Sequence, residues 1–177
     1  MNWKQDTDYV EIVKDLLADE SVKKLKKYTQ HHFSNRLDHS IYVSYMSYLI
    51  AKRLGADYVA TARAGLLHDL FYYDWRVTKF KEGSHAYVHP RIALANAKKI
   101  TTISKKEEDI IVKHMFGATI APPKYIESWI VSVVDDFAAV HEYLVPELLF
   151  TYFRINIKLE NKKSKNILKK HYNFNIK

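Results

Sequence analysis

The 177-residue chain contains no cysteine. This absence excludes a disulfide-stapled fold and any site in which thiolates bind zinc or an iron–sulfur cluster. The chain is nevertheless long enough to bury a core without such staples. Because disulfides belong to oxidising compartments, a chain without cysteine fits a cytoplasmic location, which is our expectation.

Glycine and proline are also scarce, at four residues each. Little turn chemistry is therefore available, and runs of β-branched residues with the two-residue period of a strand are missing. Apolar residues recur instead at the three- and four-residue spacing of helices. The sequence predicts an all-α fold, a single compact helical bundle.

Long hydrophobic runs are absent as well. No apolar stretch approaches the roughly 20 residues that a membrane-spanning helix requires. The first residues, MNWKQDTDYVEIVKDLL, carry acidic side chains early and lack the apolar stretch of a secretory signal. We therefore expect no association with a membrane.

Acidic residues are outnumbered, 20 against 28 lysines and arginines, which gives a formal charge of +8. Much of the excess lies in two lysine-rich stretches, KKLKKY near the start and KLENKKSKNILKK near the end. One interpretation is a merely solvated surface, and the other is attraction of phosphorylated ligands. No basic–aromatic motif of a known nucleic-acid reader is present, so a nucleic-acid partner is not expected.

Helical periodicity and end signals divide the chain into elements. Ser104 and Glu107 form a capping-box pattern, Gly117 follows the helix that they open, and Gly55 ends an earlier helix. Pro90 is placed at a first helical position. The predicted helices cover residues 8–18, 20–32, 37–54, 57–72, 90–101, 105–115, 124–142 and 146–170. The long irregular connection over 73–89 is expected to be functional or mobile, and the whole chain, 1–177, is expected to form one domain.

Six ionisable residues fall on or beside apolar helix faces: His39, His68, Asp69, His89, His114 and Asp135. Taken singly, each histidine is more often a hydrogen-bonded core residue, and either aspartate could pair with a nearby cation. Four histidines and two aspartates on different elements instead indicate convergence on a metal. Imidazole and carboxylate ligands without thiolates suit Fe, Mn, Ni, Zn or Co, whereas Mg is less favoured.

Small residues precede the His68–Asp69 pair. Thr61, Ala64 and Gly65 share the helix face that leads to His68. Side chains of this size let a second backbone come close. We expect that second backbone to be the helix that carries His39.

The order of these six residues along the chain resembles the HD-domain superfamily of metal-dependent phosphohydrolases. The stretches NRLDHS, AGLLHDLFYYDWR and HAYVHPR look most like small bacterial HD hydrolases. The resemblance covers about residues 36–141 and implies a helical HD-type core with flanking N- and C-terminal helices.

The resemblance also implies two divalent metal ions per chain. The first would be bound by four residues: His39, His68, Asp69 and Asp135. The second would be bound by His89 and His114, with Asp69 as the bridge. Asp136 competes with Asp135 for the last position, and we favour Asp135 because the motif and the small-residue face both point to it.

The implied reaction is hydrolysis of a phosphoester or phosphoanhydride bond in a small phosphorylated substrate, a nucleotide by expectation, by a metal-activated water. The expected catalytic residues are Asp69, Arg36 and His85, although His85 could equally be an exposed loop histidine. The cations expected to bind the substrate phosphate are Arg36, Arg76, Lys79 and Lys81. Three aromatic residues could stack a base or serve ordinary packing: Tyr72, Tyr73 and Trp75.

Two other functions stay open. A minority of HD proteins use the same ligands to hold two irons and activate dioxygen, so the alternative is a di-iron oxygenase acting on a small phosphorylated or hydroxylated substrate. Dependence on iron and oxygen would distinguish it from a hydrolase. A non-catalytic binding module is the third hypothesis, against which the complete ligand set argues. The apolar-rich terminal helices would also allow a homodimer.

Overall fold

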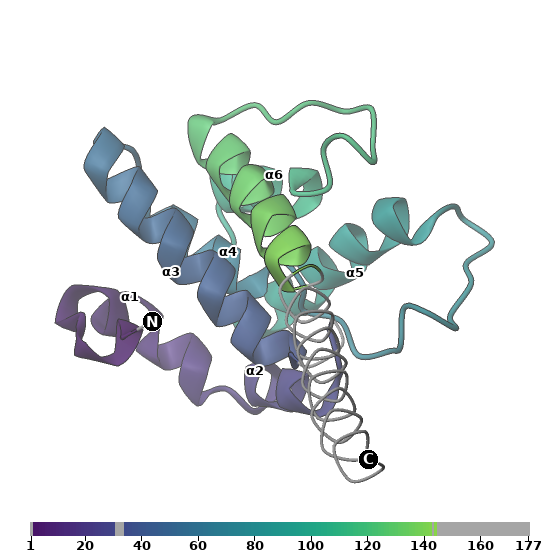
Figure 1. Ribbon diagram of the computed structural model, residues 1–177, viewed down its shortest axis with the longest axis horizontal. Helices are drawn as coiled ribbons and strands as arrows, with labels where there is room; N and C mark the ends of the chain where they lie inside the picture. The colour runs from purple at the N-terminus through teal and green to yellow at the C-terminus, as the bar shows by residue number, and fades with distance from the viewer. Residues whose placement is uncertain (1, 31–33, 143, 145–177) are drawn as a thin grey trace, which may run out of the picture. The chain divides into compact units, whose positions relative to one another are not determined.

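The computed structural model describes residues 2–30, 34–142 and 144 (Figure 1). Its helices are η1 (Trp3–Gln5), α1 (Thr7–Ala18), α2 (Glu20–Lys23), η2 (Lys24–Lys27), α3 (Arg36–Leu54), α4 (Tyr58–Leu67), α5 (His85–Ile100), α6 (Lys105–Lys113) and a helix over residues 126–142. The described residues contain no β-strand, only isolated bridges between Thr29 and Asn35 and between Phe116 and Thr119. The predicted all-α fold is confirmed.

Residues Met1–Val140 form one compact unit, and residues His141–Lys177 form a second. Few residues of the second unit are described, and the predicted helix over 146–170 lies outside the described residues. The expectation of one domain over the whole chain therefore stays a prediction. Within the described part of the chain, no helix is long and apolar enough to cross a bilayer.

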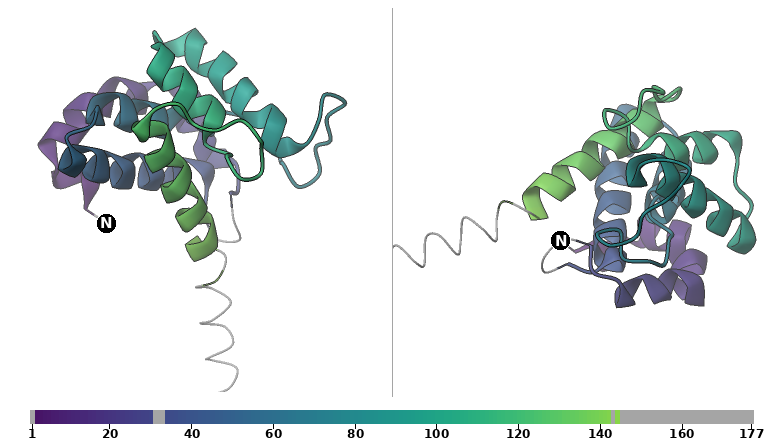
Figure 2. Two further views of the ribbon diagram at one scale, coloured as in Figure 1. Left: turned by 90° about the horizontal axis from the view of Figure 1, so that it is seen from above. Right: turned by 90° about the vertical axis from the view of Figure 1, so that its right-hand side faces the viewer.

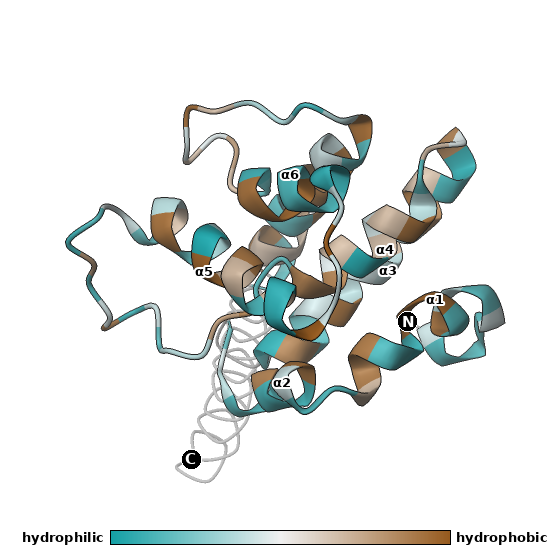
Figure 3. Cartoon of the chain, turned by 180° about the vertical axis from the view of Figure 1, so that it is seen from behind, coloured by the Kyte–Doolittle hydropathy of each residue, from teal (hydrophilic) through white to brown (hydrophobic). Residues whose placement is uncertain are grey.

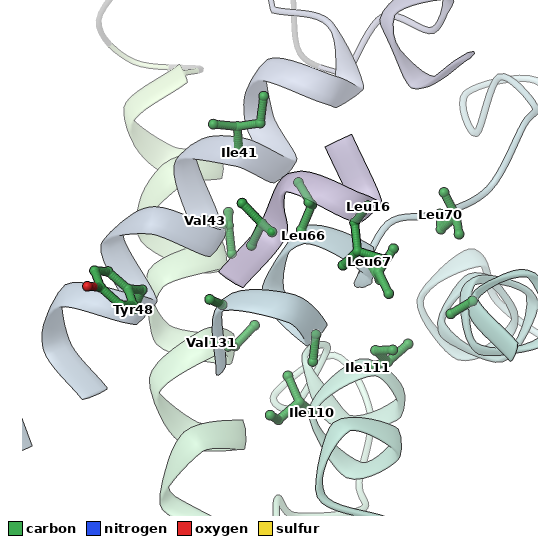
Figure 4. Close-up of a cluster of buried hydrophobic side chains, with 14 of the residues drawn as sticks. Leu16, Ile41, Val43, Tyr48, Leu66, Leu67, Leu70, Ile110, Ile111 and Val131 are labelled. Carbon is green, nitrogen blue, oxygen red and sulfur yellow. The ribbon is translucent and has the colours of Figure 1, made fainter. Parts of the chain in front are cut away.

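The helix that ends at the His68–Asp69 pair lies at the centre of the first unit. α4 contacts α1, α3, α5 and α6. Its Leu66 and Leu67 are fully buried among apolar side chains of the neighbouring helices (Figure 4). Burial of each such leucine stabilises the fold by about 1.5–3 kcal/mol. The core therefore fixes the position of the end of α4.

Small residues bring α3 and α4 together. A Cβ atom added at Gly65 of α4 would lie 3.0 Å from the Cα of Ser44 in α3. The hydroxyl of Ser44 donates a hydrogen bond of 2.6 Å to the carbonyl of Ala62. The predicted close approach of the helix that carries His39 is thus confirmed.

The predicted helix ends are confirmed at two places. Gly55 ends α3 in the left-handed conformation, with φ 67°, as expected for a residue without a Cβ. Ser104 and Glu107 form a complete capping box at the start of α6. Hydrophobic and hydrophilic residues alternate along α1, α5 and α6 (Figure 3), as expected of helices with one buried face.

The predicted bounds of α4 and α5 were wrong. α4 ends at Leu67 and not at residue 72, so His68 caps the helix. α5 begins at His85, and Pro90 lies in its second turn rather than at its first position. Proline lacks an N–H, so Pro90 cannot donate the helical hydrogen bond of its position, and α5 includes it nonetheless. The irregular connection therefore covers residues 68–84. Its first residues are buried, and its later part projects from the helices (Figures 1 and 2).

Candidate metal centre

The six residues predicted as metal ligands come from five parts of the chain and gather in one place. They are His39 in α3, His68 and Asp69 at the end of α4, His89 in α5, His114 just after α6, and Asp135 in the 126–142 helix. None is more than 8% exposed. Their nitrogen and oxygen atoms form three overlapping groups, each with all its atoms within 4.8 Å of one another.

One side of the cluster surrounds the Asp135 carboxylate. Its Oδ1 lies 2.9 Å from Nε2 of His39 and 3.4 Å from Nε2 of His68. The same nitrogen of His68 lies 3.8 Å from Oδ2 of Asp69. Two imidazoles and two carboxylates therefore point toward one another on this side.

The other side of the cluster involves the second oxygen of Asp69. Its Oδ1 lies 3.2 Å from Nε2 of His89 and 3.8 Å from Nε2 of His114. The two histidine nitrogens are 2.8 Å apart. Asp69 thus presents one oxygen to each side of the cluster, which is the geometry of a bridging carboxylate.

Hydrogen bonds to the backbone fix the tautomers of three histidines. In His68, His89 and His114, Nδ1 lies 2.7–2.9 Å from a carbonyl oxygen three or four residues earlier. A carbonyl only accepts, so Nδ1 carries the hydrogen and Nε2 of the neutral ring carries a lone pair. The lone pairs of His89 and His114 therefore face each other. Nε2 of His68 is buried and makes no well-formed hydrogen bond to any described residue.

The electrostatics of the cluster match this arrangement. Burial, with the nearby His89 and His68, lowers the pKa of His114 to about 3, so its ring is neutral at pH 7. Burial alone would raise the pKa of Asp69 and Asp135, but the surrounding histidines outweigh it and hold both pKa values well below the ordinary range. Two buried carboxylates that face imidazole nitrogens fit a divalent cation, which would bind both kinds of atom.

Comparison with known proteins agrees with the site. A family model described as "HD domain" matches residues 36–140, which is more than half of the chain. The chain belongs to the HD domain family. The predicted membership of the HD superfamily of metal-dependent phosphohydrolases is thereby confirmed, and the His68–Asp69 pair is the dipeptide of the family name.

Similar proteins include Ribonuclease Y of Clostridium botulinum (strain Hall) and of Clostridium tetani, each 32% identical over 136 residues. Ribonuclease Y of Pseudothermotoga lettingae is also 32% identical, over 134 residues. Each alignment covers 76% of this chain but only 24% of the relative. The HD protein therefore spans about a quarter of the length of these relatives.

Sequence-based prediction missed Gln30. This residue is 8% exposed, and its Nε2 donates a hydrogen bond of 2.5 Å to Oδ2 of Asp69. Its Oε1 accepts a hydrogen bond of 2.8 Å from Nε of Arg36. The predicted helix over residues 20–32 was wrong here, because the helical residues end at Lys27 and Gln30 lies in the irregular segment that follows. No end signal in the sequence distinguishes Gln30.

The surroundings of Arg36 do not match its predicted role. It was expected to bind a substrate phosphate, but it is fully buried. Its two terminal nitrogens donate to the carbonyls of Phe71 and Tyr73, at 2.7 and 3.3 Å. Its guanidinium lies 3.5 Å above the ring of Phe71. Direct contact with a substrate does not fit this placement.

A pocket of about 190 Å³ opens beside the metal-ligand cluster. Four of the ligands line it, together with Gln30, Trp75, His85, Met115, Asp136 and Ala139. Two stacked pairs of rings connect Trp75, through His85, to the predicted ligand His89. His85 stacks on His89 at 4.3 Å between ring centroids, and Trp75 stacks on His85 at 5.8 Å. Of the three aromatic residues proposed to stack a base, Trp75 lines the pocket.

His85 and Asp136 both line this pocket without joining the ligand groups. Burial, with His89, lowers the pKa of His85 to about 4, so its ring is neutral at pH 7. Burial and the adjacent Asp135 raise the pKa of Asp136. Asp135 faces the His39 side of the cluster and Asp136 does not, which supports the preference for Asp135 as the ligand.

The remaining predicted substrate contacts lie outside the pocket lining. Arg76 is exposed and pairs with Asp74 at 3.1 Å. Lys79 and Lys81 are exposed in the connection between α4 and α5. Their predicted contact with phosphate stays a prediction, and it would require a substrate that extends beyond the pocket.

Proposed function

We propose that the HD protein hydrolyses a phosphoester or phosphoanhydride bond of a nucleotide, with two divalent metal ions held on either side of Asp69. The observation that carries this proposal is the pair of unshared nitrogen lone pairs, on His89 and His114, which face each other beside an Asp69 oxygen. A divalent cation bound by both nitrogens and by the Asp69 oxygen would satisfy the two lone pairs and the carboxylate charge together. The nitrogen and oxygen ligands favour Fe, Mn, Ni, Co or Zn over Mg.

Each ligand has a defined task in this proposal. Asp69 would contribute one oxygen to each metal position, and Asp135 would add its charge beside His39. The Nδ1–H groups of the other histidines hold their rings in one orientation through the backbone. When bound, divalent metal ions lower the pKa of water toward 7 and stabilise negative charge on phosphoryl oxygens.

The pocket residues would bind the rest of the substrate. Trp75 offers a ring face for stacking with a base, since aromatic rings stack on any nucleobase. His85 is neutral at pH 7 because of its lowered pKa, so it would donate a single N–H hydrogen bond to an oxygen of the substrate. His85 would therefore still contact the leaving oxygen, as predicted. It would do so as a neutral hydrogen-bond donor and not as a positively charged acid.

RNA is the second candidate substrate. It is favoured by the similarity to Ribonuclease Y and by the stacking surface of Trp75, although the chain matches only a quarter of those proteins. A nucleotide monomer needs only the pocket. An RNA strand would also extend past it, toward the exposed Arg76, Lys79 and Lys81.

Phosphate release by metal-loaded protein tests the proposal. Protein loaded with Mn²⁺ or Co²⁺ is incubated with nucleoside mono-, di- and triphosphates and with a short RNA, while an oxygen electrode monitors a parallel sample loaded with iron. We expect metal-dependent cleavage of at least one phosphate compound. The Asp69→Ala variant should lose it, and Glu127→Gln, a buried carboxylate outside the pocket, should keep it. Oxygen consumption without hydrolysis would favour the di-iron oxygenase instead.

A further inference from the structure

We infer that Arg36 and Gln30 are positioning residues for the bridging carboxylate, with Arg36 fixing the amide of Gln30 and Gln30 fixing the carboxylate of Asp69. The inference rests on the proposed function, because it assigns both residues to the metal centre rather than to the fold alone. Arginine has no lone pair to offer a metal, and the only side-chain lone pairs of Gln30 are on the oxygen that accepts from Arg36 while its N–H faces Asp69. Their effect would therefore reach the metal through Asp69.

The guanidinium of Arg36 is held on several sides. It is fully buried, it stacks on Phe71, and its terminal nitrogens donate to two backbone carbonyls of the segment that follows the His68–Asp69 pair. Because Arg36 begins α3, one helical turn before His39, it also joins two elements that carry ligands. A side chain so constrained offers its Nε–H in one direction, and that direction is toward Gln30.

The direction of this hydrogen bond determines which end of the Gln30 amide faces Asp69. Arginine only donates, so the atom of Gln30 that meets Arg36 at 2.8 Å is the oxygen. The amide nitrogen must then face Asp69, where it donates to Oδ2 at 2.5 Å. A flipped amide would set an oxygen against the carboxylate and a nitrogen against the guanidinium, and both contacts would be repulsive.

The backbone around Gln30 is fixed as well. The Gln30 N–H donates to the carbonyl of Ser34 at 2.9 Å, and the Arg36 N–H donates to the carbonyl of Tyr28 at 2.8 Å. The indole nitrogen of Trp75 donates to the Gln30 carbonyl at 3.3 Å. The backbone of Tyr28 and Gln30 is thus tied to the start of α3 and to the pocket lining, which holds the amide beside Asp69.

The consequence for the metal centre is a carboxylate with one orientation. With Oδ2 held by Gln30, Oδ1 of Asp69 points to His89 and His114. Groups that orient a ligand in this way commonly change metal affinity by about 10–100-fold when they are removed. The hydrogen bond of Arg36 reaches Asp69 only through the Gln30 amide, so loss of Gln30 should remove the orienting effect of both residues.

Titration of the metal-free protein with Co²⁺ tests the inference. The visible spectrum of Co²⁺ reports its ligand geometry, and the titration gives stoichiometry and affinity without any substrate. The variants are Gln30→Met, Arg36→Lys and the double variant. Methionine keeps the volume of glutamine but removes its hydrogen bonds. Arg63→Lys is the matched control, because Arg63 is partly buried and binds Asp15 of α1, not a site residue.

We expect Gln30→Met to bind Co²⁺ about 10–100-fold more weakly and with a changed spectrum. Arg36→Lys should weaken binding by up to the same factor, and the double variant should bind no more weakly than Gln30→Met. Arg63→Lys should leave affinity and spectrum unchanged. Circular dichroism checks that each variant is folded. If Gln30→Met does not fold, Gln30→Asn replaces it, since asparagine is too short to reach both Arg36 and Asp69.

Three results would overturn the inference. Wild-type affinity and spectrum in a folded Gln30 variant would show that the amide does not orient the bridge. An Arg36→Lys effect that persists in full beside Gln30→Met would show that Arg36 acts by another route. A wild-type protein that binds no Co²⁺ would refute the proposed function together with the inference, whereas the first two results would leave that function standing.

Discussion

Two buried carboxylates on the same helix have opposite surroundings. Glu127 and Asp135 both belong to the 126–142 helix and are 4% and 8% exposed. Glu127 accepts hydrogen bonds from Nζ of Lys106 at 3.0 Å and from the backbone N–H of Asp57 at 2.9 Å. Asp135 instead faces Nε2 of His39 and of His68.

The difference separates a structural charge, that of Glu127, from a proposed metal ligand, Asp135. The charge of Glu127 is balanced by a lysine that also pairs with Asp57 at 3.1 Å, so the protein completes this network by itself. Around Asp135 the nearest groups are imidazoles, and one of them, His68, lacks a well-formed hydrogen bond at Nε2. Both carboxylates are buried, and they differ in whether the protein places a lysine beside them.

The largest effect is expected from Asp69→Ala, which removes the proposed bridge. Both metal ions should be lost, and phosphate release should fall by at least about 10³-fold, because metal activation of water contributes several kcal/mol. Elemental analysis and initial rates measure the two effects. Two metals per chain in the folded variant would contradict the bridging role of Asp69.

Removal of metal should destabilise the wild-type protein much more than the Asp135→Asn variant. A ligand at 1,000 times its dissociation constant stabilises the native state by about 4 kcal/mol, so a chelator should lower the melting temperature of the wild type measurably. Asp135→Asn weakens the site, so the chelator should change its melting temperature far less. Equal shifts in both proteins would indicate that the chelator acts away from the site.

Glu127→Gln should produce the reverse pattern. The variant loses the charge that pairs with Lys106, and its free energy of unfolding should fall by about 1–3 kcal/mol. Its metal content should equal that of the wild type. Urea denaturation and elemental analysis measure the two quantities, and loss of metal from this variant would remove the distinction between the two carboxylates.

The smallest effect concerns pH in the metal-free protein. Burial raises the pKa of Glu127, but hydrogen bonds from the Asp57 backbone and Lys106 outweigh it and lower the pKa below its ordinary 4.5. A carboxyl with a lowered native pKa stabilises the fold above its ordinary pKa, and this contribution is lost as the pH falls through the native value. The stability difference between wild type and Glu127→Gln should therefore be full at pH 7 and shrink below about pH 4.5. A difference independent of pH would exclude the charge as its cause.

Much of the fold follows from local signals in the sequence. The end of α3 at Gly55 and the start of α6 at its capping box depend on neighbouring residues, so the local sequence predicts both. The small residues around Gly65 predict that another helix comes close there, and α3 does. The six predicted ligands also lie together, as their positions on buried helix faces indicated. Their binding of metal stays a prediction.

The features that the sequence could not give depend on contacts between distant segments. Gln30 acquires its role from Asp69, which is 39 residues away along the chain. From its position near His39, Arg36 was predicted to bind phosphate. In the structure its guanidinium donates instead to the carbonyls of Phe71 and Tyr73. The start of α5 before Pro90 was missed because a proline in a second turn gives the same local signal as one in the first.

The most direct test of the account is the number of metal ions per folded chain. Protein stripped by a chelator is reconstituted with Mn²⁺ or Co²⁺, freed of excess metal, and assayed by elemental analysis. The account predicts two ions per chain, because Asp69 presents an oxygen to each side of the cluster. No bound metal after reconstitution would contradict it and would leave the His68–Asp69 pair a role in the fold alone.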